Sequence, residues 1–410
     1  MKKMSFVEFV AAMAASMSIY AMAIDAMLPA LPAIGQYFSV ADANHLQWIV
    51  TFFVAGGGTG QLFYGPLADR VGRRPVLLLG LALYVVLALL ASFASSLPML
   101  LALRFSQGLV AAVASVVPRA IIRDRHAGAK MAKVMSITLI VFLIVPVIAP
   151  TLGQGLLLIV PWQGIFAFMA LYGSAVALWI YLRLPETQDP KHRRAISILN
   201  LGQAATRVVT EPSSIFYTFG VLCMQGSLMV YIATMPQIFT TAFHRPALMP
   251  TIFALCAGTM AVAAFFNSRI VERVGMRRVS HGTLTVFILL TGTHAAVCMA
   301  GQETLVTYAV LQALTMGCFG MTSANFNAIA MHKMGAVAGS AASVQGFLVM
   351  VGGALVGSLI GQMWNGYVTF LPVGALICGL AAMASVLVAE KGRLFGKDHL
   401  HADEPPHIID

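Results

Sequence analysis

The 410-residue chain has little charge: Asp, Glu, Lys and Arg make up 10% of it, against roughly 25% in a typical soluble domain. Hydrophobic residues make up 59%, and the mean hydropathy is +0.85. The shortage of charge excludes an ordinary soluble protein. It indicates an integral membrane protein in which most side chains face lipid or other helices.

Motifs of several enzyme classes are also missing from the sequence. There is no GxxxxGK[ST] loop to hold ATP phosphates, and neither GxSxG nor HExxH occurs. Five cysteines lie in apolar runs without a CxxC pair, and we interpret them as core residues: Cys223, Cys256, Cys298, Cys318 and Cys378. We therefore expect no enzyme, no cofactor and no metal site. If the protein transports a solute actively, the energy must come from an ion gradient, because the sequence has no ATP-binding loop.

Apolar runs of about 20 residues are long enough to cross a bilayer, and they must be helical because lipid offers no partner to open backbone groups. Twelve such runs are present. They lie near 8–33, 46–64, 75–94, 98–120, 134–157, 163–183, 213–239, 249–268, 280–299, 304–330, 337–360 and 367–389. The sequence predicts an all-α integral membrane protein with twelve transmembrane helices.

A polar segment at 65–74, called the knot below, separates the second and third runs. Its last six residues, 69–74, recur at 272–277 with a constant offset of 203 and a match at five positions. This offset is about half the chain length, which indicates a duplicated unit. We expect two six-helix pseudo-repeats of the same orientation, a relation found in secondary transporters.

The longest polar break divides the chain into six runs plus six. We expect an N-terminal bundle at 1–184, a cytoplasmic linker at 185–212 carrying Lys191, Arg193 and Arg194, a C-terminal bundle at 213–390 and a cytoplasmic tail at 391–410. The tail holds three His and four acids from Asp398 onward. We interpret it as a solvated tail rather than a metal site.

The distribution of basic residues sets the expected orientation. With both termini in the cytoplasm, 23 of the 25 Lys and Arg residues fall on the cytoplasmic side. The exceptions are Arg245, on the other side, and Arg104, within a span. The net charge of +10 therefore follows membrane topology, and we expect no nucleic-acid partner.

Two charges lie deep in predicted spans: Asp25 in the first and Arg104 in the fourth. Each costs about 2.5–3.5 kcal/mol on insertion scales, so each is a functional candidate. They lie at similar predicted depth, where they are expected to pair or to compete through water. We predict that both take part in proton coupling; the alternative is a fixed salt bridge that only joins helices.

Proline and glycine interrupt the fifth run at Pro146, Pro150 and Gly153. We predict a gating helix that faces the eighth or eleventh span, the alternative being a kinked packing helix. Uncharged polar residues are weaker candidates for a substrate cavity, together with Asp25: Gln61, Gln107, Gln225, Tyr231, Asn325, Asn327 and Gln345. His294 in the ninth run is expected to be a hydrogen-bonded packing residue.

These segments resemble a known family. The knot resembles the signature loop of the major facilitator superfamily, and the longer stretch 60–75 is similar to the bicyclomycin/chloramphenicol-resistance (Bcr/CflA) group of drug:proton antiporters. Three further segments resemble motifs of the same group: 25–32, 104–108 with Asp124, and 149–153. Gln154 and Ala324 depart from the residues common in the group. The resemblance implies a gating loop and an antiporter motif at Pro146, Pro150 and Gly153. The gating loop comprises Gly65, Asp69, Arg70, Gly72, Arg73, Arg74 and Asp124.

The resemblance also implies a function. We expect a monomeric, proton-coupled exporter of lipophilic drugs or toxic small molecules, multi-pass in the bacterial inner membrane and surrounded by its lipid. The alternative is a facilitator for a physiological solute. Asp69 is expected to approach the start of the eleventh helix, around 335–340, when the carrier faces outward, because a helix N-terminus favours a carboxylate.

Overall fold

The computed structural model describes residues 4–188 and 198–396. Lys191, Arg193 and Arg194 of the predicted linker lie outside the described residues, as does the tail from Asp398 to Asp410. Every regular element in the described part is helical. This confirms the all-α prediction.

The N-terminal half contains six membrane-crossing units, two of which are broken into shorter helices. Its elements are α1 (Phe6–Asp25), η1 (Leu28–Ala30), α2 (Leu31–Tyr37), η2 (Ala43–Gln47), α3 (Trp48–Val71), α4 (Arg73–Ser92), α5 (Leu97–Ala111), α6 (Val113–Arg125), α7 (Gly128–Leu156) and α8 (Gln163–Arg183). The first unit breaks directly after Asp25, and Pro29 is the second residue of η1. A proline at that point removes a backbone donor and ends the α-helical ladder.

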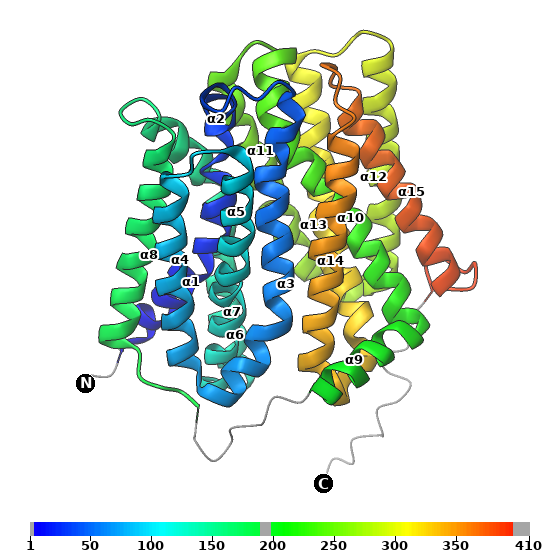
Figure 1. The fold of residues 1–410 in the computed structure, drawn as a ribbon. Helices are drawn as coiled ribbons and strands as arrows, with labels where there is room; N and C mark the ends of the chain where they lie inside the picture. The colour runs from blue at the N-terminus through cyan, green and yellow to red at the C-terminus, as the bar shows by residue number, and fades with distance from the viewer. Residues whose placement is uncertain (1–3, 189–197, 397–410) are drawn as a thin grey trace.

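The C-terminal half repeats this plan and is preceded by an additional helix. Its elements are α9 (Ile198–Thr210), α10 (Pro212–Gln237), η4 (Ile238–Ala242), η5 (Pro246–Leu248), α11 (Met249–Val274), α12 (Met276–Met299), α13 (Leu305–Met331), η6 (His332–Val337), α14 (Ala338–Gly361) and α15 (Phe370–Ala389). Helix α9 lies within the predicted linker and packs on α14 (Figure 1). The sequence analysis did not predict it.

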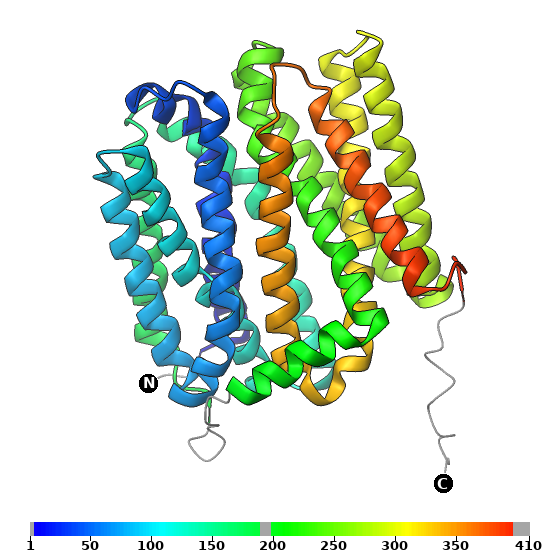
Figure 2. The same ribbon diagram turned by 45° about the vertical axis from the view of Figure 1, so that its right-hand side comes forward.

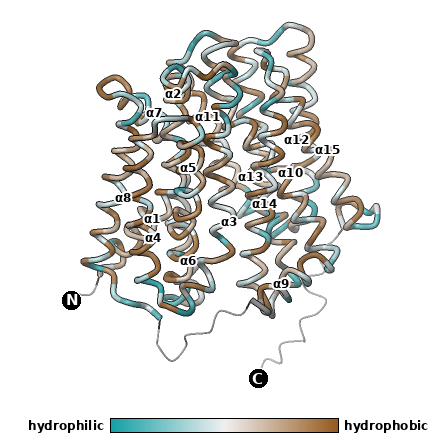
Figure 3. Tube along the Cα trace, viewed as in Figure 1, coloured by the Kyte–Doolittle hydropathy of each residue, from teal (hydrophilic) through white to brown (hydrophobic). Residues whose placement is uncertain are grey.

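Ten helical segments of the described chain are long and apolar enough to cross a membrane. The helices α3 and α7, of 24 and 29 residues, complete the twelve predicted crossings. Apolar residues cover the outside of the bundle, and polar ones gather toward its ends (Figure 3). On α4, for example, Leu79, Leu83, Val86 and Leu90 are all exposed and share one face.

The two halves lie side by side (Figure 2). Helix α3 of the first half packs along α14 of the second, and α7 packs against α11. Glycines let α3 and α14 pack closely. Met350 packs against Gly58, Gln61 against Gly346 and Gln47 against Gly361, each in the space that a larger side chain would fill. These contacts run from the start of α3 to its middle and are called the seam below.

The repeated knot has a related structure in both halves. Gly72 and Gly275 separate consecutive helices with φ of 120° and 93°, which L side chains rarely adopt. Glu186 follows the sixth crossing and accepts hydrogen bonds from the backbone N–H groups of Arg73 and Arg74. Glu390, 204 positions later, follows the twelfth crossing and accepts a hydrogen bond from Arg277. The shared arrangement confirms that the two halves are related.

Candidate functional site

Asp25 is the last residue of α1 and is only 4% exposed. The backbone of α7 lies close to the break that follows Asp25, because Gly153 has no side chain and packs directly on the carbonyl group of Ala26. The prediction of a buried acid in the first crossing is therefore confirmed. Because the α-helix ends at Asp25, the backbone that follows lacks the regular hydrogen bonds of an α-helix.

Arg104 of α5 is fully buried and satisfied mainly by backbone groups. It donates from Nη2 to the carbonyl oxygen of Ala23 at 2.9 Å and from Nε to that of Ile49 at 3.3 Å. Its Nη1 donates to Gln107 Oε1 at 2.7 Å, and its guanidinium lies 4.2 Å from the centre of the Phe53 ring. Arg104 thus ties α5 to α1 and α3.

Asp25 and Arg104 do not form an ion pair in the described structure, although both lie in the same half. The guanidinium binds the backbone two residues before Asp25 instead. The sequence showed that the two charges share a depth, but it could not show that backbone carbonyls would take the donors of Arg104. Asp25 therefore remains a buried acid without an adjacent cation as partner.

Further polar side chains surround this region. Among the described residues, the Tyr20 hydroxyl and the Gln107 amide nitrogen are buried and have no hydrogen-bond partner. Tyr231 of α10, from the other half, is 3% exposed, interacts electrostatically with Asp25 and lies beside Cys256. Buried polar groups without partners are costly, so this centre is suited to accept polar atoms of a ligand. The sequence analysis singled out Gln107 and Tyr231 but missed Tyr20.

One end of the interface between the halves is closed by side-chain amides, called the clasp below. Gln47 donates to Gln237 Oε1 at 2.6 Å and to the Gly361 carbonyl at 3.0 Å. Gln237 in turn donates to Asn44 Oδ1 at 2.9 Å. Asn44 and Gln362 exchange two further bonds, at 2.7 and 3.2 Å. Because every bond crosses between halves, this end is held shut.

The opposite end, where the knot lies, is open. A cavity of about 1130 Å³ reaches between the halves there. Its walls include Gln61, Asp69 and Arg73 from the first half and the segment from Gly335 to Ser343 from the second. Asp69 and the start of α14 thus line one cavity, and their predicted approach in the outward-facing state stays a prediction.

The knot is held by ion pairs within the first half. Arg73 pairs with Asp69 one turn earlier and with Asp124 of α6 at 2.9 Å. Arg74 donates to the Tyr181 carbonyl oxygen at 2.7 Å. The sequence analysis assigned Arg73 and Asp124 to one gating loop, and the structure brings the two side chains together; their role in gating stays a prediction. The sequence analysis assigned no role to Glu186, because an acid after a helix carries no distinctive pattern.

Helix α7 contacts α11 of the other half, in line with the prediction for the fifth crossing. Gly153 does not face the other half: a side chain at this position would point at the Ala26 carbonyl group of the same half. That part of the prediction was wrong, because helical spacing alone did not show which face of α7 meets α1. Pro146 and Pro150 lie inside α7, and a gating role for all three residues stays a prediction.

The uncharged candidates have varied surroundings. Asn325 donates to Asn267 at 2.8 Å and Gln345 to Ser214 at 2.9 Å, so both tie helices within the second half. Asn327 is exposed and bonded to its own helix. Gln225 packs against Gly353, also within the second half. Gln61 lines the cavity, and for all of these residues a role in substrate binding stays a prediction.

Twelve membrane crossings in two related halves, with a charged centre and one open end, define a membrane transporter. The sequence profile of the Major Facilitator Superfamily matches residues 9–357, and the chain belongs to that family. It is a multi-pass transporter of small molecules and not an enzyme.

Relatives and solved structures agree with this assignment. The chain is 29% identical to the multidrug resistance protein MdtL of Escherichia coli, over 92% of this chain and 94% of that protein. It is 27% identical to a bicyclomycin resistance protein homolog of Haemophilus influenzae, over 83% and 85%. The xylose transporter XylE of Escherichia coli shares the fold, with a TM-score of 0.73 at 11% identity over 94% and 97%.

Proposed function

We propose that this transporter is a proton-coupled antiporter that exports lipophilic drugs or toxic small molecules across the bacterial inner membrane. The observation that carries the proposal is Asp25, a buried acid at the break in the first crossing. The names of the relatives, which refer to multidrug and bicyclomycin resistance, support the substrate class.

The proposed orientation places the knot and both termini in the cytoplasm. The bias of 23 basic residues toward that side supports it. In this orientation the cavity opens to the cytoplasm, and the clasp closes the periplasmic side. The structure then corresponds to a state ready to take substrate from the cell.

Exchange follows from competition at one carboxyl group. A proton on Asp25 removes the negative charge, and loss of that proton restores a site for a cationic or polar group of the drug. Tyr20, Gln107 and Tyr231 offer further polar contacts around a largely apolar region. Because one buried carboxyl group holds a proton or a cation but not both, drug binding releases a proton.

The proposal is tested by adding drug to purified protein in weakly buffered detergent solution and recording proton release. A drug-susceptibility panel in an efflux-deficient host selects the compound. The parent should release protons, and Asp25→Asn should insert normally but release none and lose export driven by a pH gradient. A matched control is Asp403→Asn in the tail, which should behave as the parent.

Two outcomes would overturn parts of the proposal. Proton release and export by Asp25→Asn at the parent level would place the proton site elsewhere. A panel in which no drug becomes less toxic would instead favour the alternative, a facilitator for a physiological solute.

A further inference from the structure

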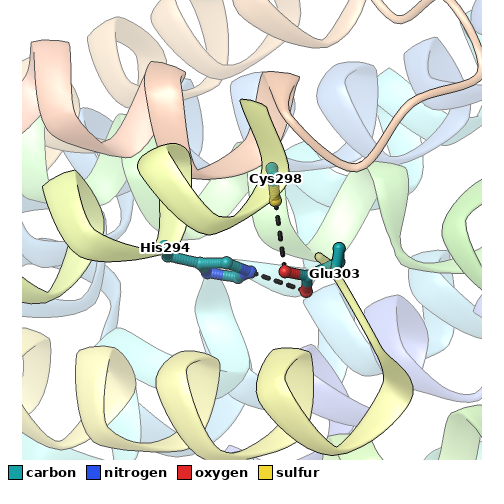
Figure 4. A group of neighbouring side chains, drawn as sticks. All are labelled: His294, Cys298 and Glu303. Carbon is teal, nitrogen blue, oxygen red and sulfur yellow. Dashed lines mark hydrogen bonds and ion pairs between the residues drawn. The ribbon is translucent and has the colours of Figure 1, made fainter. Parts of the chain in front are cut away.

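Three side chains with metal-binding atoms meet at the clasp end of the second half, outside the lining of the cavity. They are His294 and Cys298, one turn apart on α12, and Glu303 in the loop before α13 (Figure 4). His294 Nε2 lies 3.0 Å from Glu303 Oε1, and Cys298 Sγ lies 3.3 Å from Glu303 Oε2. The three ligand atoms lie within 4.8 Å of one another.

The cluster is held in place by its surroundings. The His294 side chain is 1% exposed and that of Glu303 is 11% exposed, so the ligands are enclosed but reachable from solvent. The Tyr308 ring packs edge-on against the imidazole at 5.8 Å. This packing and the two hydrogen bonds to Glu303 hold the side chains near one another before any ion arrives, which reduces the ordering cost of binding.

One nitrogen, one sulfur and one oxygen ligand suit zinc, which accepts all three types in tetrahedral geometry. Around a tetrahedral zinc ion, two ligand atoms lie about 3.3–3.5 Å apart, given Zn–N and Zn–O distances near 2.0 Å and Zn–S near 2.3 Å. His294 Nε2 and Cys298 Sγ approach different oxygens of the Glu303 carboxyl group, Oε1 at 3.0 Å and Oε2 at 3.3 Å. One ligand atom from each side chain can come within reach of a single ion after a small closing movement, because the three ligand atoms already lie within 4.8 Å of one another. We propose that His294, Cys298 and Glu303 form a zinc-binding site, with water as the fourth ligand.

Charge balance supports this assignment. Zinc binding converts the Cys298 thiol to a thiolate and releases its proton to solvent, while His294 binds as neutral imidazole. The thiolate and the Glu303 carboxylate then neutralise the two positive charges of the ion. A neutral assembly costs far less to bury than an unpaired ion would.

The structural consequence is a fixed connection between α12 and the segment that starts α13. The sequence analysis expected no metal site, and it identified His294 as a hydrogen-bonded packing residue. The hydrogen bond is confirmed. The spacing of His294 and Cys298 puts them on one helix face. The third ligand comes from a loop whose path the sequence does not reveal.

The test uses the full chain without an affinity tag, stripped by a chelator and titrated with zinc against a chromophoric competitor. We expect one tight site per chain. Cys298→Ser, which preserves side-chain size, should weaken that site at least about a hundredfold, since loss of an outer-shell partner alone costs 10–100-fold. Glu303→Gln should weaken it as well.

Two controls separate this site from other sources of binding. Cys318→Ser removes another half-buried thiol of the second half and should change nothing. A full-length variant with His399, His401 and His407 all replaced by Ala removes the imidazoles of the tail and should keep the tight site. If that variant loses it, the tail and not the cluster binds zinc.

Cobalt gives a second readout that does not depend on affinity. Cobalt bound to a thiolate shows a sulfur-to-metal charge-transfer band in the near ultraviolet, which should be present in the parent and absent in Cys298→Ser. The proposal is overturned if stripped protein binds no zinc tightly, which would leave the cluster as a hydrogen-bonded connection only. It is also overturned if Cys298→Ser binds zinc as the parent does.

Discussion

At the scale of single residues, Arg104 shows what a sequence can and cannot reveal. Its depth in the membrane followed from hydropathy alone, because a lone cation in an apolar run is conspicuous. Its partners did not, since the carbonyl groups of Ala23 and Ile49 belong to the backbone and leave no pattern. For the same reason the sequence analysis missed two other features: the hydrogen bonds of Glu186 to backbone N–H groups, and the buried hydroxyl group of Tyr20.

Arg104→Ala should therefore destabilise the protein as well as change transport. It removes two buried hydrogen bonds from a charged donor to carbonyl groups, each worth about 1.5–3 kcal/mol. We expect a clearly lower melting temperature in detergent, while Arg269→Ala, which removes an exposed arginine, should melt as the parent does. A normal melting temperature with an altered pH profile of transport would instead support a role for Arg104 in proton coupling alone.

At the scale of elements, the twelve crossings were predictable because each is an apolar run about as long as a bilayer is thick. Helix α9 was missed because it has only 13 residues and is amphipathic, with Ala204 and Val208 buried and polar residues between them. A search for long apolar runs does not detect such a helix. Its periodicity would have revealed it.

Two glycines of α7 offer a matched comparison. A side chain at Gly153 would overlap the carbonyl group of Ala26, beside Asp25, whereas one at Gly155 meets nothing. Gly153→Leu should therefore displace the end of α1 and abolish or greatly reduce transport, and Gly155→Leu should retain it. Equal transport by the two variants at equal membrane abundance would contradict this view of α7.

At the scale of the whole molecule, the duplicated knot and the six-plus-six division were legible in the sequence. Contacts between the halves were not, because they depend on how two separate bundles meet. Asn44, Gln47 and Gln237 carry no pattern that would pair them across 190 positions. The closed clasp and the open cavity therefore emerged only from the structure.

The clasp should control how often its end opens. Each of its hydrogen bonds contributes about 0.5–1.5 kcal/mol, so Gln47→Ala with Gln237→Ala, which removes three of them, should raise the open population at least about tenfold. Hydrogen–deuterium exchange should become faster in 43–47 and near Gln362. Gln302→Ala, at an exposed glutamine of the same end, is the control. Unchanged exchange in the double variant would mean that other contacts hold this end shut.

The seam between α3 and α14 constrains how the halves can move. Gly58 and Gly346 face bulky partners near the middle of α3, so pulling the helices apart there would open voids. Tilting one helix about the middle of the other avoids that cost. Helix α3 is about 36 Å long, so a tilt of about 10° moves each end by about 3 Å. That displacement exceeds the tolerance of a hydrogen bond. The seam therefore acts as a fulcrum, and the clasp should break as a unit instead of loosening bond by bond.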